Sequence, residues 1–238
     1  MIAVVVPCFN EAHRLKADQF KDFIEKNSNY HFYFVDDGSN DNTFELLTRS
    51  FSNVKRCSIF NVVENVGKGE AIRTAIKRID INRYEYVSFI DADLEIPLNQ
   101  LIKLSKKIST YPRSLIVISR RTNRNKEKRF FIRNLGSKMI SLISQKLLRL
   151  NNPIVDTQCG CKMLRVEIVH IFEKPFISSW LFDLEILLRI RNYKKRSDQW
   201  IHEVSLHELN SVNAKRNYTF KSALHLTNQL YKINRAYN

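Results

Sequence analysis

Short apolar runs alternate with helical patterns along the N-terminal part of this chain, and each run ends in polar residues. Four runs predict buried strands, at residues 2–6, 32–35, within 54–63, and at 86–90. The segments between them carry apolar residues at helical spacing. Strands and helices alternating at this distance predict an α/β fold with a parallel sheet. Open sheets of this kind bind ligands at the carboxyl ends of their strands, so we expect the polar residues to converge there.

The fourth run ends in Asp91-Ala92-Asp93. Side chains two residues apart on a strand point the same way, and two close carboxylates are unfavourable unless a cation lies between them. Carboxylate oxygens are the ligands that Mg²⁺ and Mn²⁺ prefer, often together with a substrate phosphate. We therefore predict a Mg²⁺ or Mn²⁺ site with Asp91, Asp93 and Glu95 as ligands. Taken alone, an Asp-X-Asp pattern is also common in turns.

Length and cysteine usage indicate one intracellular domain. A chain of 238 residues can bury a sizeable core as a single domain, 1–238. The cysteines show neither an extracellular disulfide pattern nor zinc-ligand spacing, which favours reduced thiols. No apolar run is long enough for a membrane span, and no signal peptide precedes the first strand. We expect a cytoplasmic protein.

Positive charge is concentrated in one stretch. Between Lys103 and Arg149 there are fourteen Lys and Arg residues and one acid, Glu127, which accounts for +13 of the net charge of +15. Residues 128–149 combine apolar positions at helical spacing with a basic face. Such a helix can lie on an anionic membrane surface, or it can be a core helix with a solvated basic face. A nucleic-acid interface is a third interpretation, but it would leave the paired carboxylates without a purpose, so we expect no nucleic acid.

Several segments, in order, resemble the family 2 glycosyltransferases of the GT-A fold: Val4–Glu11, Val35–Ser39, Gly67–Gly69 and Asp91–Leu94. Later segments resemble the polyprenyl-phosphate branch, which includes the dolichyl-phosphate mannose and glucose synthases: 119–121, 156–163 and 180–185. The resemblance extends from about residue 2 to about residue 215. It implies a Rossmann-like, mostly parallel sheet flanked by helices, with a C-terminal extension of helices and strands. Residues 1–120 would form the nucleotide-sugar half and residues 121–238 the acceptor half.

The resemblance also implies a donor site. Asp93 and Glu95 would hold the ion, and Glu11 would accept hydrogen bonds from ribose hydroxyls. The remaining donor-binding residues would be Pro7, Phe9, Val35, Asp37, Lys68, Asp91 and Ala92. Two of these have simpler explanations. Asp37 is equally suited to a turn with Gly38 and Ser39, and Lys68 to the first turn of a helix.

Arg120 is expected to bind either the donor diphosphate or the acceptor phosphate, because a planar guanidinium suits that task. On the acceptor side, Arg133 is a weaker candidate for the acceptor phosphate. Gln158 would be a further polar group there. Lys215 would correspond to the family's Gly-Ser-Lys lysine, although the glycine is missing here and the preceding loop is two residues longer. Relatives often carry transmembrane helices or recruit a membrane protein, so such a partner is expected too.

The implied reaction is inverting, metal-dependent transfer of a hexose from a nucleotide sugar of the UDP-glucose or GDP-mannose type to a polyprenyl (dolichyl or undecaprenyl) phosphate, at the cytoplasmic face of a membrane. Asp93 and Arg120 are the predicted catalytic residues. A phosphate acceptor arrives ionised and needs no general base. A sugar hydroxyl, in an enzyme that extends a surface glycan, would need one, and Asp183 or Glu185 would be the candidates, although Asp183 also suits a helix N-cap. The alternative from another class is a basic binding module with an inactive site.

Overall fold

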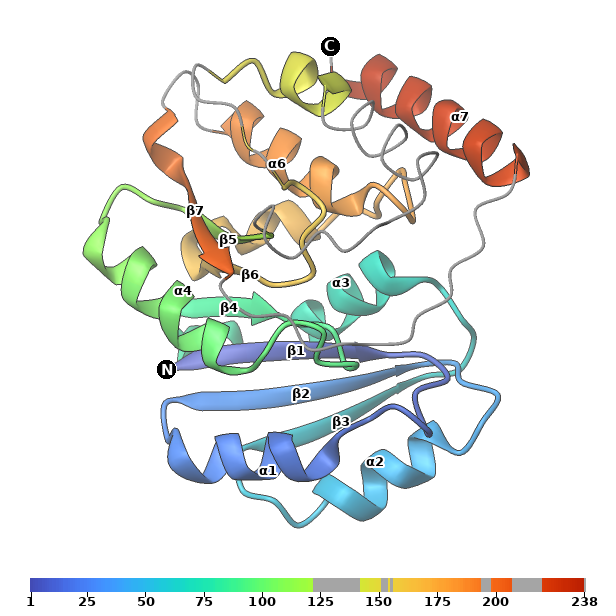
Figure 1. The fold of residues 1–238 in the computed structure, drawn as a ribbon, viewed down its shortest axis with the longest axis vertical. Helices are drawn as coiled ribbons and strands as arrows, with labels where there is room; N and C mark the ends of the chain where they lie inside the picture. The colour runs from blue at the N-terminus through green and yellow to red at the C-terminus, as the bar shows by residue number, and fades with distance from the viewer. Residues whose placement is uncertain (122–141, 151–153, 155, 194–197, 207–219, 238) are drawn as a thin grey trace.

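A seven-stranded sheet forms the centre of the molecule, with strand order β3-β2-β1-β4-β6-β5-β7 (Figure 1). The computed structural model describes residues 1–121, 142–150, 154, 156–193, 198–206 and 220–237. All neighbouring strands are parallel except β6, which runs antiparallel to both β4 and β5. The strands are β1 (Ile2–Cys8), β2 (Tyr30–Asp37), β3 (Cys57–Val62), β4 (Tyr86–Phe89), β5 (Ile116–Arg121), β6 (Lys162–Arg165) and β7 (Ile201–Leu206). The predicted α/β fold and its four N-terminal strands are confirmed.

Helices connect and cover these strands. They are α1 (Ala17–Lys26), α2 (Thr43–Phe51), α3 (Lys68–Arg78), α4 (Asn99–Thr110), α6 (Phe182–Tyr193) and α7 (Phe220–Tyr237), with 3₁₀ turns η1 (Ile81–Arg83), η3 (Val166–Phe172) and η4 (Asp198–Trp200). The turn at Val166–Phe172 is a 3₁₀ helix. Its buried residues Ile168 and Ile171 are three apart, which matches three residues per turn.

Aromatic packing fixes the helices on one face of the sheet. Phe34 of β2 stacks on Phe51 of α2 at 4.1 Å between ring centroids and meets Phe20 of α1 edge-on at 5.2 Å. Tyr30, on the same face of β2, shares a 3.1 Å hydrogen bond with Ser105 of α4. Helices α1, α2 and α4 therefore cover one face, and Figure 1 shows α1 and α2 beside the β1–β3 part of the sheet.

Helix α3 covers the opposite face. The guanidinium of Arg78 lies 5.8 Å from the ring centre of Phe60, which stacks on Tyr33, a β2 residue that points away from Phe34. The N-terminal turn of α3 packs on α6, where a Cβ at Gly69 would stand 2.7 Å from the ring of Phe182. A side chain at this position would therefore separate the two helices.

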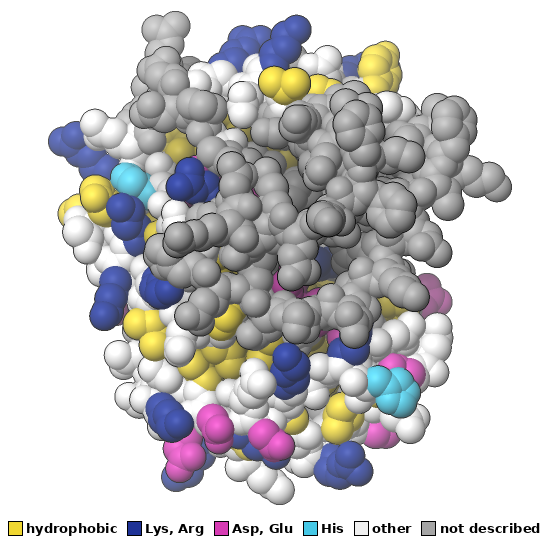
Figure 2. All heavy atoms as spheres, in the orientation of Figure 1, with side chains coloured by type: hydrophobic (Ala, Val, Ile, Leu, Met, Phe, Trp, Pro, Cys, Tyr) yellow, Lys and Arg dark blue, Asp and Glu magenta, His cyan; other side chains and the backbone are white. Residues whose placement is uncertain are grey.

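Only part of the basic stretch lies in the described residues. Residues 122–141, including Arg133, are outside them, and residues 142–148 form a helix. In that helix Leu147 and Leu148 are buried, as a core helix requires, whereas Leu142 is 67% exposed. In the view of Figure 2 the acidic side chains lie in the lower half, while Lys and Arg appear in both halves. Within the described part of the chain, no helix is long and apolar enough to cross a membrane.

Candidate active site

The polar residues that follow the strands meet at one edge of the sheet. Phe89 of β4 and Ile118 of β5 both pair with Lys162 of β6. Continuing this register by two residues brings Asp91, Gly160 and Arg120 to the same level. Because neighbouring strands lie about 4.8 Å apart, Asp91 and Arg120 are separated by roughly 10 Å across β6. The antiparallel direction of β6 means that the turn before this strand, not its end, contributes to the edge.

Asp91 is held between two parts of the chain. Its carboxylate forms an ion pair with the ammonium of Lys68, the first residue of α3. On the other side it lies against the main chain at Gly160, where a Cβ would stand only 2.2 Å from Asp91 Oδ2. The Lys68 ammonium on α3 attracts the Asp91 carboxylate, and the absence of a side chain at Gly160 leaves room for it. Both elements therefore fix the position of this carboxylate.

Glu11 lies close enough to Asp93 and Asp91 for their charges to act on it. It is 9% exposed, and its Oε1 accepts a 2.5 Å hydrogen bond from Arg14. Burial is the largest cause that raises the pKa of Glu11 to about 7. Arg14 opposes this rise, while Asp93 and Asp91 add to it. The carboxylates of Glu11, Asp91 and Asp93 therefore create a field that favours a cation.

Asp93 closes a tight turn. Its Oδ1 accepts a 3.0 Å hydrogen bond from the Glu95 amide, and Leu94 between them has a φ of +52°. Among the described residues, no group of three or more His, Cys, Asp or Glu side chains is arranged to hold a metal. The chain alone thus does not gather Asp91, Asp93 and Glu95 into a closed cage, and their ligand roles remain a prediction. One or two carboxylates completed by substrate phosphates would still suit Mg²⁺ or Mn²⁺.

The Asp37 carboxylate ties β2 to the loop before α3. It accepts hydrogen bonds of 2.9 Å from the amides of both Val66 and Gly67, and burial raises the pKa of Asp37 in opposition to these bonds. The side chain that bonds to Ser39 is instead that of Asp36, at 2.5 Å. The structure thus gives Asp37 a positioning role just ahead of Lys68, and its contact with a base remains a prediction.

The remaining donor-side residues differ in exposure. Phe9 leaves 41% of its surface exposed and so presents a ring to a ligand, and Pro7 is half-buried. Val35 and Ala92 are buried, at 0% and 3% exposure, so their side chains belong to the core of the sheet. Their predicted contacts with the donor are not tested by this packing.

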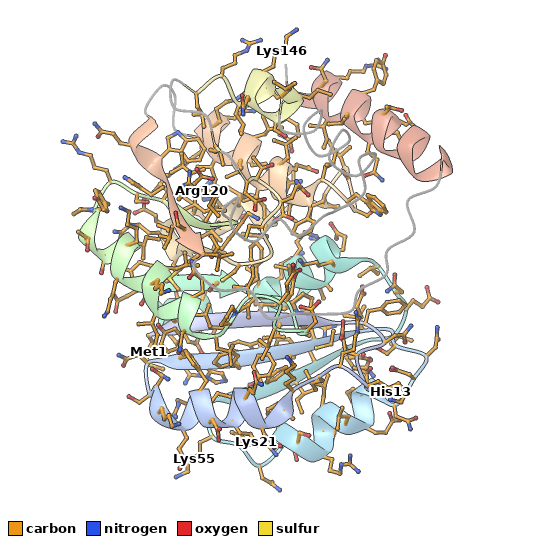
Figure 3. The ribbon with its side chains drawn as sticks, viewed as in Figure 1. Met1, His13, Lys21, Lys55, Arg120 and Lys146 are labelled. Carbon is orange, nitrogen blue, oxygen red and sulfur yellow. The ribbon has the colours of Figure 1, made fainter. Side chains whose placement is uncertain are left out.

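On the predicted acceptor side, Arg120 is the last residue but one of β5 and donates a 3.1 Å hydrogen bond to Ser205 of the neighbouring β7. Figure 3 places Arg120 within the outline of the molecule beside β7, whereas Lys146 projects at its periphery. Gln158 is half-buried in the turn before β6. Arg133 and Lys215 lie outside the described residues.

Two acidic residues that the sequence suggested as bases are engaged elsewhere. Asp183 is 4% exposed and accepts a 2.5 Å hydrogen bond from the ammonium of Lys162. Glu185 is fully buried and accepts hydrogen bonds from Arg189 at 2.7 Å and Tyr237 at 2.8 Å. The N-cap role that the sequence suggested for Asp183 is wrong, and Lys162 was not among the residues that the sequence singled out. Asp183 lies inside α6, not at its cap. A lysine at the first position of β6, between Cys161 and the apolar residues 163–164, was the available signal for an ion pair.

The structure is an α/β fold whose charged residues meet at one edge of the sheet. Residues 3–172 match the model of glycosyl transferase family 2, and the chain belongs to that family. The predicted family 2 glycosyltransferase is confirmed at this level.

Two of the similar proteins carry the same name. The chain is 31% identical over 210 residues to the dolichyl-phosphate beta-glucosyltransferase of Saccharomyces cerevisiae, covering 79% of this chain and 61% of that protein. It is 30% identical over 206 residues to the enzyme of the same name from Dictyostelium discoideum, covering 78% and 61%. The chain therefore spans about three fifths of the length of these relatives.

Solved structures show the same fold. Mannosyl-3-phosphoglycerate synthase from Rubrobacter xylanophilus superposes with a TM-score of 0.75 at 16% identity, covering 99% of this chain and 73% of that one. Glucosyl-3-phosphoglycerate synthase from Mycobacterium tuberculosis, in complex with Mn²⁺, UDP and phosphoglyceric acid, gives a TM-score of 0.69 at 16% identity, covering 98% and 78%. At this identity the likeness concerns the fold alone, and it confirms the predicted GT-A-type sheet.

Proposed function

We propose that this chain transfers a hexose, glucose first among the candidates, from a nucleotide sugar to a polyprenyl phosphate. The observation that carries the proposal is the placement of the Lys68–Asp91 pair and of Arg120 at one sheet edge, on either side of the turn before β6. Similarity to dolichyl-phosphate beta-glucosyltransferases over most of the chain supports the acceptor and the sugar.

The donor would bind on the β1–β4 side. Phe9 would present its ring to the nucleoside, and Glu11 would accept hydrogen bonds from the ribose hydroxyls. Lys68 lies at the N-terminus of α3, where the ammonium and the helix N-terminus both favour a diphosphate. Asp37 supports this arrangement by holding the loop that leads into α3.

The acids at this edge fit a divalent cation. Burial is the main cause of the raised pKa of Glu11, and the negative charges of Asp93 and Asp91 raise it further. Asp93, with Asp91 or Glu95, would hold Mg²⁺ or Mn²⁺ together with the donor phosphates. When bound, such an ion would supply positive charge that stabilises the departing nucleoside diphosphate.

The acceptor phosphate would bind on the β5 side. An oxygen of the polyprenyl phosphate would attack the anomeric carbon as the bond from that carbon to the donor diphosphate breaks. The nucleoside diphosphate leaves with the electron pair of that bond, and the configuration is inverted. The attacking oxygen is already ionised, so no proton has to be removed, and the task of Arg120 is to position the phosphate.

Asp183 and Glu185 are already hydrogen-bonded to other side chains, and this favours transfer to a phosphate over transfer to a sugar hydroxyl. A general base needs hydrogen-bond reach to the acceptor, and both carboxylates are buried and bonded to Lys162 or to Arg189 and Tyr237. A phosphate acceptor removes the need for either of them.

A membrane surface would deliver this lipid substrate, at its cytoplasmic face. Helix 142–148 exposes Leu142 and Lys146 one turn apart, so part of the basic stretch combines an apolar and a charged side chain on its outer side. Liposome flotation tests the idea. We expect recovery with anionic vesicles that falls as salt rises, because salt screens exposed charges. Equal recovery with neutral vesicles would contradict it.

The decisive experiment measures the transfer of radiolabelled sugar from the nucleotide sugar to the acceptor. With radiolabelled UDP-glucose and Mn²⁺, label should enter an organic-extractable, acid-labile product only when polyprenyl phosphate is supplied. GDP-mannose serves as the second donor arm. Equal labelling of free polyprenol, or of a sugar hydroxyl, would overturn the phosphate acceptor and favour a glycan-extending enzyme instead. No transfer to any acceptor, with no hydrolysis of the donor, would leave the binding-module alternative.

A further inference from the structure

Lys162 is a fully buried cation that joins two separate parts of the chain. Its Nζ donates to the main-chain oxygen of Cys159 at 2.6 Å and to Oδ1 of Asp183 at 2.5 Å. The ammonium also lies 5.6 Å from the ring centre of Phe89. A buried charge is tolerated only with such partners. The contacts fasten the turn before β6 to the first turn of α6.

The peptide that Lys162 holds leads directly into Gly160. A Cβ at Gly160 would lie 2.2 Å from Oδ2 and 2.6 Å from Cγ of Asp91. The Asp91 carboxylate therefore rests on the main chain of this turn, and any shift of the turn moves the surface against which Asp91 is placed. The chain of contacts runs from Asp183 through Lys162 and Cys159 to Gly160 and Asp91.

We propose that Lys162 is a positioning residue for the donor site: it fixes the turn at residues 159–160, and this turn sets where the Asp91 carboxylate stands. This proposal rests on the proposed function in one respect, because the proposed function makes Asp91 part of the donor site. Lys162 itself touches no reacting atom. A displacement of about 1 Å at a reacting centre can reduce a rate about a hundredfold, so a turn that cannot shift helps to maintain the rate.

The competing explanation is that Lys162 only neutralises Asp183. The double variant Lys162→Met/Asp183→Leu separates the two explanations. Replacing both members of a buried ion pair with apolar residues of similar size is often neutral or stabilising. The variant should therefore fold, and its loss of stability should be no larger than that of one buried hydrogen bond, because the main-chain oxygen of Cys159 loses the donor that Lys162 supplies. We expect kcat to fall about a hundredfold, the KM for polyprenyl phosphate to stay unchanged, and a crystal structure of the variant to show a displaced Asp91 carboxylate.

Gly160→Ala tests the other end of the same chain of contacts. The new methyl group collides with the Asp91 carboxylate, while the buried Lys162–Asp183 ion pair stays intact. Ser88→Ala is the matched control. It removes a buried 2.7 Å hydrogen bond to the main-chain oxygen of Lys162 but does not touch the ammonium. The control should lose stability and keep kcat close to the wild-type value.

The outcomes distinguish this proposal from the proposed function. A wild-type chain that transfers no hexose to polyprenyl phosphate contradicts the proposed function, whereas the crystal structure of the double variant still reports the position of Asp91. The positioning role is wrong if Asp91 is unmoved in that structure. It is equally wrong if the double variant has both wild-type stability and wild-type kcat.

Discussion

Lys68 and Asp91 form an ion pair that joins the start of α3 to the loop after β4, with 34% and 35% of their side chains exposed. The proposed donor site therefore contains a cation in the protein itself. A diphosphate that binds here attracts the ammonium, and a divalent ion attracts the carboxylate. In the proposed reaction, binding of the donor and of the metal would replace the Lys68–Asp91 pair with a Lys68–diphosphate contact and an Asp91–metal contact.

Lys68→Met should impair transfer without unfolding the protein. A half-exposed pair contributes about 1 kcal/mol or less to stability, whereas loss of a cation that stabilises departing charge lowers kcat/KM by about a hundredfold. Steady-state kinetics and thermal unfolding measure the two effects. Lys77→Met, an exposed lysine on the same helix, is the control. An unchanged kcat/KM would remove Lys68 from the donor site.

Asp93→Asn should abolish the response to metal. The asparagine Oδ1 can still accept from the Glu95 amide, so the turn survives and stability should stay within about 1 kcal/mol of the wild type. Wild-type protein should show a rise in Tm with UDP and Mn²⁺ together, as a ligand that binds the folded state requires. The variant should lack this rise, and Asp18→Asn, 97% exposed on α1, should keep it. A full rise in Asp93→Asn contradicts the ligand role.

Glu11 should make the stability of the ligand-free protein depend on pH. Its pKa in the folded state, about 7, lies above the ordinary value of 4.5, mainly because of burial. The folded chain thus binds this proton more tightly than the unfolded chain does. The contribution to stability is complete below pH 4.5 and is lost as the pH rises to about 7.

Glu11→Gln should remove this dependence. The Tm of the variant minus the Tm of the wild type should increase as the pH rises across that interval, and should stay constant above it. Glu25→Gln, at an exposed position on α1, controls for the change of net charge. Parallel pH profiles for wild type and Glu11→Gln would show that the carboxyl group titrates normally.

Glu185→Gln should destabilise the fold rather than block chemistry. The guanidinium of Arg189 is 11% exposed and would lose its charged partner, which costs about 3–5 kcal/mol in a buried pair. Denaturant unfolding measures this loss, and the kcat of the folded fraction should be preserved. The exposed Glu167→Gln serves as the control. A stable but inactive Glu185→Gln would instead identify a base and revive the hydroxyl acceptor.

Arg120→Gln should act on the acceptor alone. We expect kcat/KM for polyprenyl phosphate to fall about a hundredfold, since a positioned guanidinium is lost, while calorimetry should show unchanged UDP binding with Mn²⁺. Arg113→Gln, an exposed arginine on the loop before β5, is the control for the loss of charge. Weakened UDP binding in Arg120→Gln would move this residue to the donor side.

The sequence by itself was sufficient for the α/β class and for the four N-terminal strands. The antiparallel direction of β6 came from the tertiary structure. Strand and helix periodicities are local, and a parallel α/β arrangement follows from their alternation. The position of Asp91 and Asp93 at the end of β4 follows from the apolar run that precedes them. The family follows from motifs that are contiguous in the chain.

Only the tertiary structure decided which partner each charged group has. Asp37 bonds to amides that lie about thirty residues further on, Lys162 bonds to Asp183 on another element, and Glu185 meets Tyr237 near the far end of the chain. A sequence pattern gives the face on which a side chain lies, but not the group from a distant segment that packs against it. That choice depends on how the elements pack, because a buried charge is stable only where packing brings a partner to it.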